Sequence, residues 1–124
     1  MKLHYFHGRG PLKDLVMLRE DQRIELHIRP VGDGLWGLVA LSGPDQGRPG
    51  GQFLRGPWRT VASAESVLRS IAGTMMGKGY DPRPNDYAVW SVTAQRLART
   101  IGTPGAEKFS SEAEADPDQF KPLI

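Results

Sequence analysis

The chain has 124 residues, of which 39% are apolar, so it has the length of one domain and enough apolar residues for one core. It contains no cysteine, which excludes disulfides, thiolate nucleophiles and cysteine-ligated metal sites. Its net charge of +2 hides an uneven distribution: residues 1–102 carry 14 Lys and Arg against 9 Asp and Glu, whereas residues 103–124 carry 2 against 5.

No sequence feature points to a membrane. The first residues lack the apolar stretch of a signal peptide, and no apolar run approaches the ~18 residues that span a bilayer. We therefore expect a cytoplasmic protein with no membrane association.

The first half of the chain predicts an antiparallel sheet of four to five strands. Residues 3–6 are β-prone, and residues 15–18 form a short apolar run that favours a strand over a buried helical turn. Residues 23–29 alternate strictly, with three aliphatic side chains facing one way and four polar side chains facing the other. That pattern is typical of an antiparallel strand with one buried face.

Two further strands are expected. Residues 35–41 are apolar on both faces, as in a central strand, and the glycine turn before them predicts a hairpin with residues 23–29. After a glycine-rich loop, residues 52–61 predict another strand. Pro57 within it indicates a sheet edge or a bulge, because proline cannot donate a hydrogen bond to a neighbouring strand.

The second half predicts two helices, at about residues 63–76 and 86–101, that pack on the sheet. Ser63 is the expected N-cap of the first helix, and Asn85 or Asp86 that of the second. Apolar side chains recur at helical spacing in both segments. The predicted buried stripes are Ala64, Val67, Leu68, Ile71, Ala72 and Met75 in the first, and Tyr87, Trp90, Ala94, Leu97 and Ile101 in the second.

Apolar periodicity disappears after residue 102. The remaining residues are rich in Ser, Glu and Asp and cannot bury enough apolar surface to offset the entropy of ordering. The sequence therefore predicts one α+β domain over residues 1–102 and an acidic, disordered tail over residues 103–124.

Basic residues are the clearest functional signal. Arginines bind phosphates, and an exposed aromatic ring can stack on a base. We therefore predict a small non-catalytic module that binds DNA or RNA through a basic sheet face. The alternative interpretation of this face is a solvated surface of mixed charge, with Trp58 packed in the core. The predicted contact residues are Arg23, His27 and Arg29 on one strand face, and Arg48, Arg55, Trp58 and Arg59 in the loop and strand that follow.

A second function class stays open. The protein is then an interaction or regulatory adaptor that binds a protein partner, or another copy of itself, and no nucleic acid. Its docking elements are the sheet face or the apolar tip of the tail, formed by Phe120, Leu123 and Ile124. The sequence leaves the oligomeric state open.

No catalytic constellation can be named. The chain has no nucleophile elbow, P-loop or dinucleotide-binding glycine motif. His4 and His7 are three residues apart, so in a strand they face opposite sides and cannot share a metal. We expect no enzyme activity, no cofactor and no metal.

The order of motifs over roughly residues 23–80 resembles the WGR domain, an α+β module of DNA-damage polymerases that make poly(ADP-ribose) and of stand-alone bacterial proteins. Residues 47–52 read G-R-P-G-G-Q where that family has G-R-x-G-x-x-G-Q, and residues 75–80 read M-M-G-K-G-Y where it has K-x-x-K-G-Y. The resemblance implies DNA contact through Arg48 and neighbouring strand residues. The chain departs from the family at Gln46, where the signature tryptophan is expected, in a loop one residue shorter, and in its second predicted helix.

Overall fold

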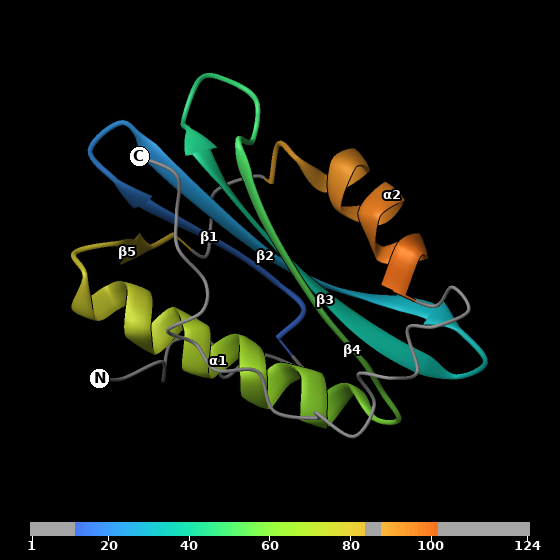
Figure 1. Ribbon diagram of the computed structural model, residues 1–124. Coiled ribbons are helices and arrows are strands. Elements are labelled where there is room, and N and C mark those ends of the chain that lie inside the picture. Colours follow the sequence, from blue (N-terminus) through green and yellow to red (C-terminus); the bar gives the residue numbers. More distant parts are fainter. Residues whose placement is uncertain (1–11, 84–87, 102–124) are drawn as a thin grey trace.

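The computed structural model describes residues 12–83 and 88–101, which form a five-stranded antiparallel sheet with one helix on each face (Figure 1). The strand order across the sheet is β4-β3-β2-β1-β5. The predicted α+β class, with four to five antiparallel strands and two helices, is confirmed. The elements are β1 (Asp14–Arg19), β2 (Gln22–Gly32), β3 (Leu35–Pro44), β4 (Gly51–Trp58), α1 (Val61–Gly77), β5 (Asp81–Pro82) and α2 (Ser91–Ile101).

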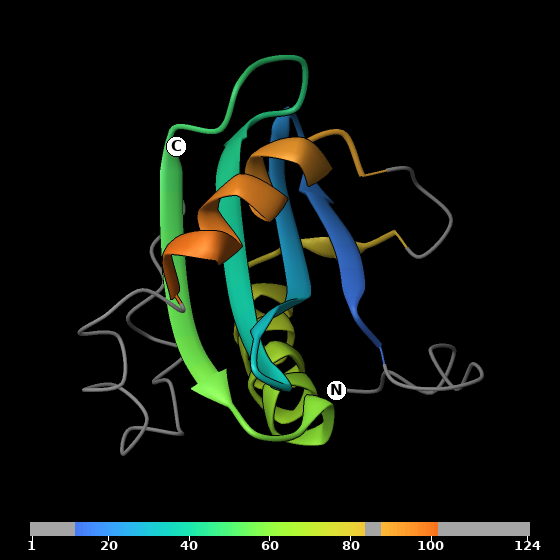
Figure 2. The same ribbon diagram turned by 90° about the vertical axis from the view of Figure 1, so that its right-hand side faces the viewer.

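The two long strands β2 and β3 form the centre of the sheet, and Figure 2 shows α2 in front of it and α1 behind. Leu26 pairs with Leu15 of β1 and Ala40 of β3, and its side chain points toward α1. The neighbouring residue His27 pairs with Asp14 and Val39 and points toward α2. The alternation of residues 23–29 therefore separates an apolar α1 side from a polar α2 side.

The α1 side holds the larger core. All six apolar residues predicted to line α1 are buried, and they pack against the even-numbered side chains of β2. Each of the larger ones, Val67, Leu68, Ile71 and Met75, contributes about 1.5–3 kcal/mol when it is removed from water. The helix starts earlier than predicted, because Thr60 and not Ser63 is the N-cap: its Oγ1 accepts a hydrogen bond from the Ser63 N–H at 3.1 Å. The helix ends at Gly77, as the glycines predicted.

The α2 side holds a smaller core and differs more from prediction. The helix begins at Ser91 rather than near residue 86, and the two residues expected to cap it lie outside the described residues. Trp90, Ala94 and Ile101 are buried as predicted, and Leu97 is half-buried. Tyr87 also lies outside the described residues. Two small side chains, Ala94 and the unpredicted Ala98, allow α2 to lie close to the sheet.

Several sequence expectations fall beyond the described residues. They concern the strand at residues 3–6, the tail, and the docking tip Phe120, Leu123 and Ile124. Neither helix in the described part of the chain is long and apolar enough to cross a membrane.

Candidate anion-binding groove

The polar face of β2 is buried, which corrects the expectation of a basic surface there. Arg23 is 5% exposed, and Glu25 and His27 are 0% exposed. The cause is α2, which together with residues 88–90 covers this side of the sheet (Figure 2). Strict alternation of polar and apolar residues indicated the two faces of β2 correctly. It could not show that each face is covered by a helix, α1 on one side and α2 on the other.

A linear network of ion pairs lies on the polar face of β2, where an exposed face was predicted. Charges alternate in sign along it, so each cation lies between carboxylates or at an end of the network. Its two ends, Arg29 and Asp45, are partly exposed, and so is Asp14 next to Arg29, whereas the central pair of His27 and Glu25 is fully buried. The contacts are Arg29 Nη2 to Asp14 Oδ1 at 2.8 Å, Asp14 Oδ1 to His27 Nδ1 at 2.7 Å, His27 Nε2 to Glu25 Oε1 at 2.8 Å, Glu25 Oε2 to Arg23 Nε at 2.7 Å, and Arg23 Nη1 to Asp45 Oδ1 at 2.8 Å.

His27 lies at the centre of this network. Each of its ring nitrogens lies within hydrogen-bond distance of a carboxylate oxygen, and an ionised carboxylate only accepts, so this geometry favours the form of His27 in which both nitrogens carry a proton. Burial acts to lower the pKa of His27, but the hydrogen bonds to Asp14 and Glu25 outweigh it and raise that pKa above its ordinary value. Folding therefore favours the imidazolium form of His27.

Glu25 connects the sheet to the entry of α2. Its carboxylate accepts hydrogen bonds from His27 and Arg23, from the Val89 N–H at 2.7 Å and from the Trp90 N–H at 3.1 Å. Burial acts to raise the pKa of Glu25, but the hydrogen bonds from His27, Val89 and Arg23 outweigh it and lower the pKa below its ordinary value. A carboxylate from another part of the chain thus stands at the positive end of the α2 dipole, where a local cap was expected.

Trp90 connects α2 to the β3–β4 loop. Its indole Nε1 donates to the carbonyl oxygen of Gly47 at 3.1 Å, and the guanidinium of Arg23 lies 5.9 Å from its ring centroid. Gly43 brings the same loop close to β3, because a Cβ atom there would lie 2.8 Å from the carbonyl oxygen of Arg48. The loop and the start of α2 are therefore fixed relative to each other.

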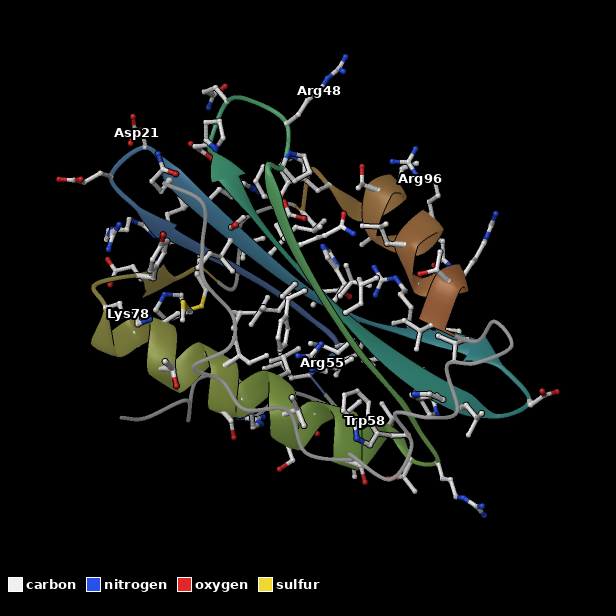
Figure 3. The ribbon with its side chains drawn as sticks, in the orientation of Figure 1. Asp21, Arg48, Arg55, Trp58, Lys78 and Arg96 are labelled. Atoms are coloured by element: carbon white, nitrogen blue, oxygen red, sulfur yellow. The ribbon has the colours of Figure 1, made fainter. Side chains whose placement is uncertain are left out.

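A groove of about 600 Å³ lies between these two elements. Two exposed arginines, Arg48 from the loop and Arg96 from α2, belong to its lining, and Figure 3 shows both side chains extending outward. The lining contains no Asp or Glu. Its residues are Gly47, Arg48, Pro49, Gly50, Gly51 and Gln52 on the loop side, and Val89, Trp90, Thr93, Arg96 and Leu97 on the α2 side.

Of the seven predicted contact residues, only Arg48 reaches the groove. Arg55 lies on β4 with its guanidinium 4.0 Å from the Phe53 ring centroid, and Arg59 is exposed beyond the end of β4. Trp58 is 3% exposed within the α1-side core, so the expectation that it stacks on a base is corrected. Arg96 was not predicted as a site residue, although α2 has two arginines and no acidic residue.

The ion network is not arranged as a metal site. Across residues 12–83 and 88–101, no group of three or more His, Asp or Glu side chains could hold a metal ion. The carboxylates of Asp14 and Glu25 are instead satisfied by arginine and histidine donors.

Replacing Glu25 by glutamine should lower the free energy of unfolding by about 3–5 kcal/mol, because Arg23 and His27 lose their buried counter-charge. The amide group of the glutamine also places an N–H group where the carboxylate had accepted hydrogen bonds from its neighbouring donors. Urea unfolding measures the change. Asp21→Asn, an exposed acidic residue in the β1–β2 turn, is the matched control and should change stability by less than about 0.5 kcal/mol. Equal stability of the two variants would contradict the buried network.

The free energy of unfolding should be greatest between about pH 4.5 and pH 6.5. The pKa of His27 is raised by folding, so its stabilisation is complete below about pH 6.5 and is lost as the pH rises through the raised pKa. The pKa values of Asp14 and Glu25 are lowered by folding, so their stabilisation is complete above about pH 4.5 and is lost as the pH falls through the lowered values.

Urea unfolding at a series of pH values checks this expectation. His27→Gln should remove the alkaline decline in stability and keep the acid decline. An alkaline decline of the same size in wild type and His27→Gln would show that another group causes it.

Comparison with known proteins gives a family and no described function. Neither a curated protein nor a solved structure matches the chain at a significant level. The resemblance to the WGR domain stays a prediction. The sequence model of the family described as PA4575-like protein matches residues 1–119, which is nearly the whole chain. The chain therefore belongs to the PA4575-like protein family.

Proposed function

We propose that this protein is a small non-catalytic nucleic-acid-binding module whose contact surface is the groove between the β3–β4 loop and α2. The observation that carries the proposal is that Arg48 and Arg96, which are distant in sequence, line one concave surface whose lining has no acidic residue. Guanidinium groups are the side chains best suited to phosphate, because they offer several N–H donors in a planar fork.

The arginine side chains, rather than the loop backbone, supply the positive charge. The Gly47 N–H already donates to the carbonyl oxygen of Pro44 at 3.1 Å, and the Gly50 N–H donates to that of Ser42 at 2.8 Å. The loop therefore does not offer a row of N–H groups to an anion in the manner of a phosphate-binding loop. In the described part of the chain, no carboxylate forms an ion pair with Arg48 or Arg96.

The wider charge distribution favours an extended anion over a small one. Residues 46–64 and 88–101 contain no Asp or Glu, and they contribute β4, the loop before it except for Asp45, and α2. Asp81 lies instead on β5, at the opposite edge of the sheet, and Asp45 of the β3–β4 loop is paired with Arg23. An anionic polymer is attracted to such a one-signed edge. The arginines of the acid-free segments are Arg48, Arg55, Arg59, Arg96 and Arg99.

The buried network does not argue for catalysis. An Asp–His pair is common in active sites, but here His27 is 0% exposed and both its nitrogens are occupied. It cannot reach a proton on a bound substrate. In this proposal the network holds the groove in shape.

Arg48→Gln and Arg96→Gln should each weaken binding of labelled oligonucleotides, because each removes a phosphate contact. The slope of log affinity against log salt should fall by about one for each substitution. Fluorescence anisotropy at about 50 mM and 200 mM salt measures both quantities.

Lys78→Gln is the matched control. Lys78 is exposed at the end of α1, and Figure 3 shows it far from Arg48 and Arg96. Its substitution therefore removes one positive charge, as the arginine substitutions do, without changing the groove. Its affinity and salt slope should stay close to wild type. If wild type shows no binding at low salt, the nucleic-acid proposal fails and the adaptor alternative is favoured. An equal loss for all three variants would indicate attraction by overall charge rather than by the groove.

A further inference from the structure

We infer that the groove selects single-stranded over double-stranded nucleic acid, with a phosphate held between Arg48 and Arg96 and a base lying against an apolar wall on the α2 side. This inference rests on the proposed function and names the substrate class of the same site. The wall is formed by Val89, Trp90 and Leu97, which belong to the groove lining together with the two arginines.

One residue of the apolar wall, Val89, is unusually exposed for an apolar side chain. Val89 is 59% exposed and Val92 is 79% exposed, and they are the large hydrophobic residues that stand out as exposed in the described part of the chain. Both lie at the start of α2, and Val89 faces the groove, whereas Val92 is not part of its lining. An exposed apolar side chain beside two cations suits a ligand that has an apolar face and an anionic group.

Val89 is held in place although its side chain is exposed. Its N–H donates to Glu25 Oε2 at 2.7 Å, and the next residue, Trp90, is fixed by two hydrogen bonds, one to Glu25 and one to Gly47. Because the wall is positioned before the ligand arrives, binding does not have to order it.

The shape of the groove distinguishes a single strand from a duplex. Its volume of about 600 Å³ lies within the range of pockets that enclose one small ligand, which is the scale of a nucleotide. In a duplex the flat faces of the bases are stacked inside, and only phosphates and base edges are presented. In a single strand the bases can splay out and lie on apolar or guanidinium surfaces. Only the single strand can use the cations and the wall together.

Anisotropy titrations with short oligothymidylate, oligouridylate, a mixed-sequence DNA duplex and an abasic sugar–phosphate strand test the inference. Wild type should bind both single strands at least about fivefold more tightly than the duplex or the abasic strand, the loss expected when one base contact is missing. Val89→Thr keeps the shape of the side chain and the backbone donor but makes the wall polar. It should weaken binding of the single strands by about threefold or more and leave the duplex and the abasic strand unchanged.

Val92→Thr is the matched control, because Val92 is equally apolar and more exposed but lies outside the groove lining. It should bind like wild type, and thermal unfolding should give both variants the wild-type midpoint. Equal binding of single strands and duplex, with no effect of Val89→Thr but a loss in Arg48→Gln, overturns the inference and leaves the proposed function standing. Absence of binding to every probe at low salt overturns both.

Discussion

The carboxylate of Glu25 is the point at which the two faces of the structure depend on each other. It is 0% exposed, and its four donors come from β2 itself and from the two residues that precede α2. A buried carboxylate without partners costs several kcal/mol, so the sheet requires α2 in place. The start of α2 in turn requires Glu25, because the N–H groups of Val89 and Trp90 need an acceptor.

The same connection reaches the groove. Glu25 fixes Trp90, Trp90 donates to Gly47, and Gly43 allows the loop backbone to approach β3. The two walls of the groove therefore share one support, although the loop and α2 are about forty residues apart in the chain. A site built from distant segments keeps its shape only if such a support is rigid, and a saturated ionic network is more rigid than a few flexible side chains.

Sequence patterns predicted the α1 side well and the α2 side poorly, for physical reasons. The apolar stripe of α1 and the alternation around Leu26 indicate burial directly, because regularly spaced apolar side chains are stabilised by removal from water. Polar positions such as Glu25 and His27 look the same whether water or other charges satisfy them, and Asp14, the partner of His27, lies on another strand. The predicted start of α2 was wrong because the N–H groups before the helix bond to the distant side chain of Glu25, which local sequence does not reveal. Arg48 was recognised, but it lines one groove with Arg96 only after folding.

The chemical difference between the two faces also determines what happens when a helix detaches. Loss of α1 uncovers a large aliphatic surface, which aggregates readily. Loss of α2 uncovers the ion pairs of β2, which water can solvate, around a smaller apolar area. Partial opening on the α2 side thus exposes less apolar surface than opening on the α1 side, and it is the less aggregation-prone local unfolding event.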